Sequence, residues 1–235
     1  MAAPAAPALT SREFVQQFKA ECHSHPKARI NHPFVKGILE GRVSMDHLRE
    51  WARQDYKFRN NVPKVAMMRY LACSDPEFGK RLYGVVQEET EGLDTGSAGH
   101  IDLFVRFAEA IGLSRKELDE APMSPATAAH LYFSELIIHQ YPWFVMMAAQ
   151  IAAEGTFGEA TAALAKGLKA NYDLSPDAVG FFTVHTEADE DHGSLAEEIA
   201  EAYLHSPLLQ QQTREVGLRR LELLYDTWSI PGFDI

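Results

Sequence analysis

Helical periodicity runs through almost the whole chain and constrains its fold more than any other feature. Apolar residues recur at the spacing of amphipathic α-helices, and no stretch alternates as a half-buried strand does. With 235 residues, 46% of them hydrophobic, the chain can bury one sizeable core. We therefore predict an all-α fold, a compact multi-helix bundle of about eight or nine helices. Residues 1–10 are expected to form a loose N-terminal tail, and residues 11–235 a single helical domain.

Capping and breaking residues predict where several helices begin and end. Thr10 followed by Glu13 has the spacing of a capping box, so a first helix should start there. Ser44 should cap a long helix, which Pro63 should kink or break because proline lacks the N–H that a helix interior needs. A later long helix, ending in the segment AAEG, is expected to kink at Pro142.

Net charge, apolar runs and cysteine content bear on the partners and the location of the protein. The formal net charge is −11, which disfavours nucleic acid and anionic membrane surfaces as partners. The longest apolar run, near YPWFVMMAAQIAA, is too short and too interrupted to span a bilayer. The two cysteines form neither a CxxC motif nor a disulfide framework, so we expect a reduced cytoplasmic location.

The segment HTEADEDH, residues 185–192, carries the first indication of chemistry. A helix turns about 100° and rises about 1.5 Å per residue, so His185, Asp189 and His192 fall within roughly 60° of one face. Imidazole and carboxylate are ligands that a first-row metal such as iron accepts. The alternative is a solvated acidic helix face that carries two histidines by chance.

Other ligand-type residues stand at expected helix ends. Glu154 closes the otherwise apolar run WFVMMAAQIAAEG, where it is either exposed to water or a ligand in a pocket, because burying it unpaired is costly. Glu88 and Glu89 end one helix, and His100 opens the next. Metal sites in helical proteins draw on such positions. A ferritin-like site would need two Glu-x-x-His motifs, and the chain has none, so that fold is disfavoured.

FFTV followed by HTEADEDH resembles the His-x3-Asp-x2-His helix of the heme-oxygenase-like diiron oxidases. The resemblance covers about residues 12–230 and includes LREWARQDY, the QEE helix end, GHIDLFVRFAEAIGL and AAEGTF. It is strongest to the p-aminobenzoate-forming branch, and weaker to pyrroloquinoline-quinone synthases and TenA proteins. It implies a heme-oxygenase-like bundle and a non-haem diiron oxygenase or oxidase that uses O₂ to oxidise a small molecule. A homodimer is compatible with that fold.

The resemblance also implies a ligand set for two iron ions, with manganese in one position as the alternative. The six positions that match the family's ligands are Glu88, His100, Glu154, His185, Asp189 and His192. The loop before His100 is longer here than in the family, so Glu89 or Glu91 can take the place of Glu88.

Three positions depart from the p-aminobenzoate-forming pattern. That branch consumes a tyrosine of its own chain, and the matching position is Val35. Trp51 stands at a second tyrosine position, and Leu164 stands where a lysine is expected, with Lys166 close by. The resemblance therefore implies an external substrate more than self-consumption, although Tyr56, Tyr132 and Tyr172 are alternative internal tyrosines.

Five residues are candidates for the substrate pocket. Phe181, Phe182 and Trp143 would form an apolar wall, for which plain core packing is the alternative. Tyr56 comes from a helix that lines the pocket in this fold, and His139 lies on one face with Glu135, with which it can also form a structural pair.

Two other functions remain open from the sequence. One is a cofactor-free oxidase similar to pyrroloquinoline-quinone synthase. The other is a non-catalytic interaction protein of the same fold, since one fold hosts many functions.

Overall fold

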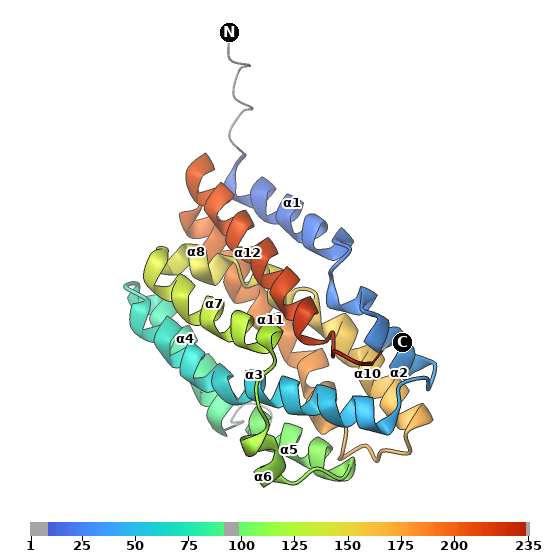
Figure 1. Cartoon of the computed structure of the whole chain (residues 1–235). Coiled ribbons are helices and arrows are strands. Elements are labelled where there is room, and N and C mark those ends of the chain that lie inside the picture. The colour runs from blue at the N-terminus through green and yellow to red at the C-terminus, as the bar shows by residue number, and fades with distance from the viewer. Residues whose placement is uncertain (1–8, 92–98, 234–235) are drawn as a thin grey trace.

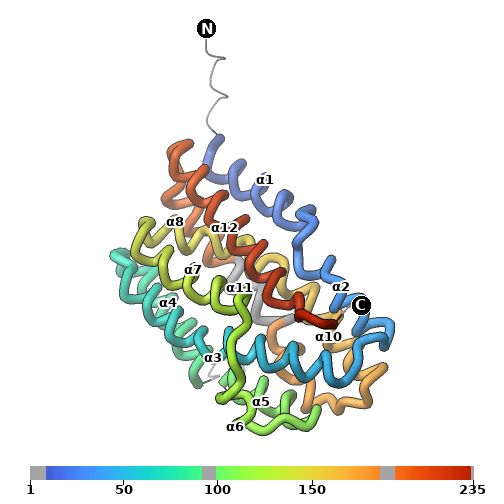
Figure 2. The backbone as a smooth tube through the Cα atoms, viewed as in Figure 1, coloured from blue at the N-terminus to red at the C-terminus, as the bar shows by residue number. Residues whose placement is uncertain are grey.

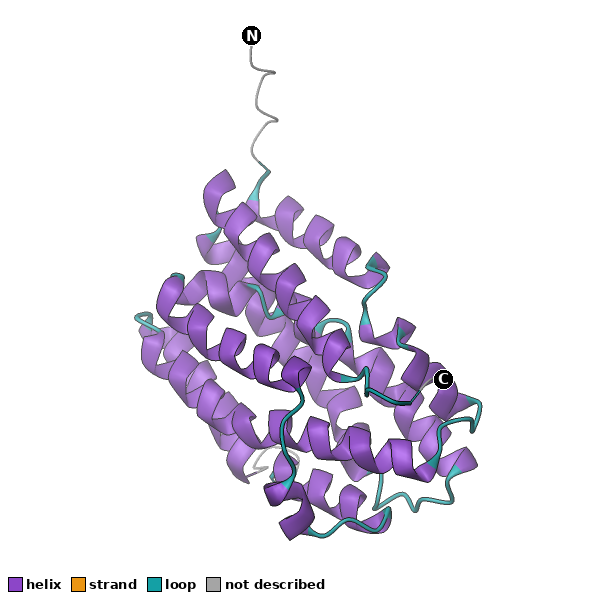
Figure 3. Cartoon of the chain, in the orientation of Figure 1, coloured by secondary structure: helices purple, strands orange, loops and turns teal. Residues whose placement is uncertain are grey.

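The predicted helices are present in the computed structural model, but they are more numerous and shorter than expected. The structure describes residues 9–91 and 99–233, and for residues 186–193 it describes the backbone alone. The predicted tail over residues 1–10 therefore lies almost wholly outside the described residues. Within these ranges the elements are helices, with no strand (Figures 1 and 3). Their bounds are α1 Ser11–Ser24, the 3-10 helix η1 Arg29–Asn31, α2 Pro33–Leu39, α3 Met45–Ala72, α4 Pro76–Glu91, α5 His100–Ala110, α6 Arg115–Glu120, α7 Pro125–Gln140, α8 Trp143–Ala148, α9 Ile151–Glu154, α10 Phe157–Asn171, α11 Gly180–Tyr203 and α12 Pro207–Thr227.

The predicted caps of α1 and α3 are confirmed. Thr10 Oγ1 accepts a hydrogen bond from the Glu13 amide at 3.2 Å, and Glu13 Oε2 accepts one from the Thr10 amide at 2.8 Å. Ser44 caps α3 by accepting a hydrogen bond from a backbone amide in its first turn. Of the kink or break expected at Pro63, the break is wrong, because α3 continues through that residue to Ala72, and the kink stays a prediction.

The long helix expected around Pro142 is instead three helices. Tyr141, the residue before the proline, is extended at φ −121° and ψ 154°, because proline disfavours helical geometry in its predecessor. α7 therefore ends at Gln140, and the chain resumes as the short helices α8 and α9. Glu154 is the last residue of α9, so this division of the helix sets the position of a ligand candidate.

The helices pack around three hydrophobic clusters. α3 contacts α4, α5 and α7, while α12 contacts α1, α7, α8 and α9 (Figures 1 and 2). α10 packs on α2 and α11, and its approach to α2 is close because a side chain at Gly167 would lie 2.8 Å from the Ile38 carbonyl oxygen. No helix in the described ranges is long and apolar enough to cross a membrane.

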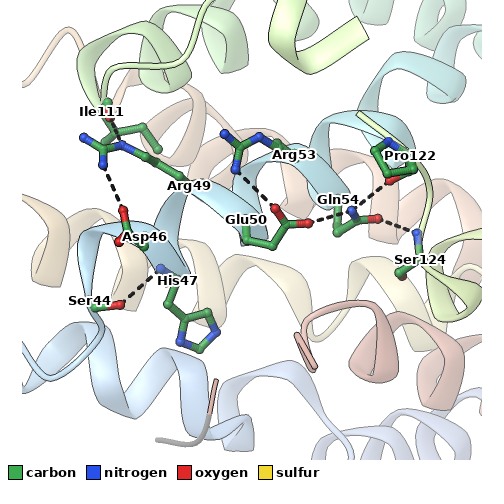
Figure 4. Close-up of polar contacts among 10 residues, drawn as sticks. All are labelled: Ser44, Asp46, His47, Arg49, Glu50, Arg53, Gln54, Ile111, Pro122 and Ser124. Carbon is green, nitrogen blue, oxygen red and sulfur yellow. Dashed lines mark hydrogen bonds and ion pairs between the residues drawn. The ribbon is translucent and has the colours of Figure 1, made fainter. Parts of the chain in front are cut away.

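Polar side chains in the first half of α3 attach two loops to it (Figure 4). Arg49 Nε donates to the carbonyl oxygen of Ile111 at 2.8 Å. Gln54 accepts from the Ser124 amide at 2.8 Å and donates to the Pro122 carbonyl at 3.1 Å. The first half of α3 is thereby tied to the connections that follow α5 and α6, while its second half faces the interior site.

Candidate metal centre

Four ligand-type side chains that the structure describes line two adjoining cavities in the interior. Glu89 lies near the end of α4, His100 opens α5, Glu154 ends α9 and His185 lies in the second turn of α11. Three of them surround a small space of about 20 Å³, the histidine cavity. Its lining residues are Arg59, Val62, Pro63, Glu89, His100, Ile101, Phe181 and His185.

A larger space of about 90 Å³, the central cavity, adjoins the histidine cavity. Glu89 and His185 line both cavities, and Glu154 lines the larger one. Helix α3 provides the longest part of its wall. The lining residues are Arg29, Phe58, Arg59, Asn61, Val62, Val65, Ala66, Arg69, Val85, Glu89, Leu131, Ser134, Ala153, Glu154, Phe157, His185, Arg220 and Leu224.

The two histidines present the same nitrogen toward possible ligands. Their rings are 4.5 Å apart between centroids, and both are buried. His185 Nδ1 lies 2.8 Å from the Phe181 carbonyl oxygen, to which it must donate, so in the neutral ring Nε2 is the nitrogen that can bind a metal. His100 Nδ1 lies 3.1 Å from Glu89 Oε2, so the same tautomer follows. A metal-binding histidine typically has its second ring nitrogen held in this way.

His100 Nε2 is a buried polar atom without a hydrogen-bond partner among the described residues. Buried polar atoms in proteins are nearly always satisfied, so an orphaned imidazole nitrogen beside Glu89 and His185 is the kind of atom that a metal ion would complete. The imidazole and carboxylate groups of His100, His185 and Glu89 therefore fit a first-row metal, which accepts such ligands.

The three candidates for the first carboxylate differ in position. Glu89 bonds to His100 and lines both cavities. Glu88 is half-buried on α4 and does not line either cavity, whereas Glu91 is exposed at the helix end. Glu154 is half-buried and faces the central cavity, as expected for a pocket carboxylate and not for one in open water.

Two ligand candidates cannot be placed in the same detail. The side chains of Asp189 and His192 lie outside the described part of the chain, although α11 carries both positions. Among the side chains that are described, no three His, Cys, Asp or Glu residues converge closely enough to hold one ion. A complete site would require the two further residues from α11.

Of the five predicted pocket residues, only Phe181 lines either cavity. Tyr56 is buried elsewhere, with its hydroxyl donating to Asp119 Oδ1 at 2.5 Å. Phe182 packs on Trp51 in the core, and Trp143 packs on Tyr203 in another cluster. His139 is exposed at the end of α7.

Four arginines of the central cavity were not expected from the sequence. Arg59 and Arg69 lie on the inner face of α3, Arg220 on α12 and Arg29 on the 3-10 helix. The burial of Arg220 could have been predicted from helical spacing, because Val216 and Leu224 lie on the same face of α12 and are buried and apolar. A charged residue within such a face indicates an interior role.

The arrangement of the helices defines the fold. The chain aligns over 95% of its length, and over 92% of the other chain, with a Shewanella denitrificans protein described as having a heme oxygenase-like fold, at TM-score 0.75 and 17% identity. This confirms the predicted all-α, heme-oxygenase-like fold. The chain belongs to the family of iron-containing redox enzymes, whose sequence profile matches residues 49–225.

Two curated relatives illustrate the range of the similarity. A 4-aminobenzoate synthase of Nitrosomonas europaea is 26% identical over 219 residues, which cover 88% of each chain. A pyrroloquinoline-quinone synthase of Ectopseudomonas mendocina is 25% identical over 111 residues, which cover 47% of this chain and 42% of that protein. The resemblance inferred from the sequence is thereby confirmed at the level of the family.

Proposed function

We propose that this protein is a non-haem diiron oxygenase or oxidase that uses O₂ to oxidise a small-molecule substrate. The observation that carries the proposal is the buried pair His100 and His185, whose Nδ1 atoms are both engaged, by the Glu89 carboxylate and by the Phe181 carbonyl. Membership of an iron-containing redox family makes iron the metal to consider first.

Six ligands are proposed for two iron ions, with manganese in one position as the alternative. His100, Glu154 and His185 are supported by their positions at the two cavities. For the first carboxylate we favour Glu89, because it contacts His100 and lines both cavities. Asp189 and His192 complete the set on the strength of their spacing from His185 along α11. Carboxylates and imidazoles from facing helices suit a two-metal site.

The chain's own residues would orient the ligands and keep the site dry. The Phe181 carbonyl fixes the tautomer of His185, and the Phe181 and Phe157 rings lie 4.3 Å and 5.5 Å from it between centroids. Arg59 stacks on Phe157 at 4.5 Å, so its alkyl stem and ring neighbours help to exclude water. Iron, when bound, supplies the redox chemistry with O₂ that side chains lack.

An external substrate is favoured over consumption of an internal tyrosine. Val35, Trp51 and Leu164, which stand at the departures from the p-aminobenzoate-forming pattern, are all buried in one hydrophobic cluster. The central cavity offers space for a separate molecule. A role in p-aminobenzoate metabolism, or in other chemistry of amines and amino-acid-derived compounds, remains part of the proposal because of the 4-aminobenzoate synthases among the relatives.

The test is the iron bound per chain after anaerobic loading with Fe(II), followed by O₂ uptake. The native chain should bind about two irons and then consume O₂. His192→Ala should lose at least one iron, whereas His23→Ala, at an exposed position of α1, should bind as much as the native chain. A native chain that binds no iron contradicts the proposal.

The second candidate is a cofactor-free oxidase. It is favoured by the relatedness to a pyrroloquinoline-quinone synthase. O₂ consumption by iron-free protein with a substrate would support it. If the protein neither binds iron nor consumes O₂, the remaining alternative is a non-catalytic interaction protein of the same fold.

A further inference from the structure

The central cavity has a strongly cationic wall in an otherwise apolar setting. Four guanidinium groups line it, against the two carboxylates Glu89 and Glu154. The remaining wall is largely apolar, with Val65, Leu131 and Leu224 among its members. Arginines are rarely placed in a protein interior unless they are paired with a negative charge.

Two of the arginines are held by the protein. Arg59 Nε pairs with the buried carboxylate of Asp55 at 2.9 Å. Arg29 donates to the Ala153 carbonyl at 2.5 Å, and its guanidinium lies 4.0 Å from the centre of the Phe157 ring. These contacts fix both side chains against the cavity wall and account for their burial.

The other two arginines have donors that no described residue satisfies. Arg220 is only 5% exposed, and its Nε and Nη1 atoms are buried without a hydrogen-bond partner among the described residues. Arg69 Nε is in the same condition. Burial lowers the pKa of both guanidinium groups, whereas the charge of Glu154 acts to raise both pKa values and the charge of Glu89 acts to raise that of Arg69. Unused donors on a buried guanidinium are costly, and an anion that accepts from them would remove that cost.

The volume of the central cavity and the polarity of its wall indicate which kind of anion fits it. A space of about 90 Å³ is smaller than the ~150 Å³ that holds benzene in an engineered cavity, so it suits a short chain or one end of a longer molecule. Guanidinium groups bind carboxylates through paired N–H donors, and the apolar wall favours a hydrocarbon body over a fully hydrated ion.

We propose that the central cavity binds a small organic carboxylate, with its carboxylate group on Arg220 and Arg69 and its apolar body along Val65, Leu131 and Leu224. Glu89, Glu154 and His185 line the same cavity, so the bound molecule would lie beside the metal centre. That this carboxylate is the substrate rests on the proposed function, whereas its binding does not.

The test compares butanoate with butanamide, which has nearly the same shape but no charge, and with inorganic phosphate. Binding would be measured calorimetrically under anaerobic conditions, on iron-free and on Fe(II)-loaded protein. The native chain should bind butanoate at least tenfold more tightly than butanamide or phosphate. Equal binding of butanoate and butanamide would overturn the proposal, and tighter binding of phosphate would overturn the assignment to a carboxylate.

Variants of Arg220 test the position of the site. Arg220→Met should remove the preference for butanoate, while its melting temperature without ligand should not fall, because a buried charge without a partner is replaced by an apolar chain. Arg220→Lys should keep part of the preference, since it retains the charge but not the planar fork. Arg219→Gln, at the exposed neighbouring position where Arg219 pairs with Glu222, is the matched control and should behave as the native chain. A preference that survives in Arg220→Met would overturn the assignment to Arg220.

Iron content separates this inference from the proposed function. Arg220→Met should bind as much iron as the native chain, because Arg220 is not among the proposed ligands. A native chain that selects butanoate but binds no iron supports the carboxylate site and contradicts the diiron function. A chain that binds iron but does not select butanoate contradicts the carboxylate site alone.

Discussion

Glu89 and Glu91 end the same helix, but their carboxylates face different surroundings. Glu89 lies 3.1 Å from His100 and lines both cavities, whereas Glu91 is exposed. Glu89→Gln should therefore weaken iron binding at least ~tenfold, because a neutral amide is a poorer ligand and partner of a ligand than a carboxylate. Glu91→Gln should leave it unchanged. Titration with Fe(II) under anaerobic conditions measures both. If Glu88→Gln loses iron while Glu89→Gln keeps it, the first carboxylate is Glu88.

Asp55 provides a second test at the scale of single residues, this time of stability. Its carboxylate accepts from Arg59 Nε at 2.9 Å and from Trp228 Nε1 at 3.1 Å, and all three side chains are buried. Asp55→Asn would leave the buried Arg59 charge without its counter-ion. Removing one partner of a buried ion pair typically costs about 3–5 kcal/mol, so we expect a loss of about 3 kcal/mol in the free energy of unfolding.

Urea denaturation of metal-free protein would measure that loss. The matched control is Asp46→Asn, on the same helix, because Asp46 is 83% exposed and pairs with Arg49 at the surface (Figure 4). Exposed ion pairs contribute about 0–1 kcal/mol, so this variant should change stability little. An equal loss in the two variants would show that burial of the Asp55 pair does not matter.

At the scale of elements, the crossing of α2 and α10 depends on a glycine. A Cβ atom at Gly167 would lie 2.8 Å from the carbonyl oxygen of Ile38 and 2.8 Å from its Cγ2 atom. The carbonyl oxygen belongs to the backbone of α2 and cannot move aside as a flexible side chain can. Gly167→Ala should therefore push the helices apart and destabilise the protein by about 1–3 kcal/mol. Gly84→Ala, on α4 where nothing lies within 4 Å, should be neutral or stabilising by up to ~1 kcal/mol because alanine favours helices. Thermal unfolding of both variants would check this, and equal melting temperatures would contradict it.

The elements also show what a sequence can predict and where local rules stop. Most helices were predicted because caps and periodicity act within a few residues, as at Thr10 and Ser44. The same rule would have found α6, whose capping box joins Ser114 and Glu117, but that helix was not predicted. The helix through Pro63 is a different case, because the packing of α3 against α4, α5 and α7 can outweigh the loss of one backbone hydrogen bond.

The assignment of the site residues as metal ligands stays a prediction, but the structure shows where the candidates lie. His100, Glu154 and His185 were candidates from helix ends and spacing and were named as ligands from the family resemblance, and the structure places them at adjoining cavities. Trp143 and Phe182 were expected at the pocket but pack elsewhere, because spacing along one helix does not say which neighbour covers a side chain. The arginines were missed because their burial depends on contacts between distant segments, such as Arg29 with Ala153.

For the molecule as a whole, buried histidines should make stability depend on pH. His32 is 4% exposed, and burial, aided by nearby His47 and opposed by Asp226, lowers its pKa to about 4. The unfolded chain should titrate near pH ~6.5, so it binds this proton more readily than the folded chain does. The contribution of neutral His32 is therefore complete above pH ~6.5 and is lost progressively as the pH falls toward about 4.

The size of the pH effect on stability follows from the lowered pKa of His32, and the His32→Asn variant isolates it. Between pH 7.5 and pH 4.5 the free energy of unfolding should fall by about 2–3 kcal/mol through His32 alone. In the folded chain His32 Nδ1 caps α2 by accepting from the Phe34 amide, and an asparagine can accept the same bond without titrating. His32→Asn should therefore lose that much less stability over the same pH range, in urea titrations of metal-free protein, while exposed His23→Asn should follow the native chain. Parallel pH profiles for His32→Asn and the native chain would mean that acid unfolding starts at other buried groups, of which His47 and His130, whose pKa values burial also lowers, are the first to examine.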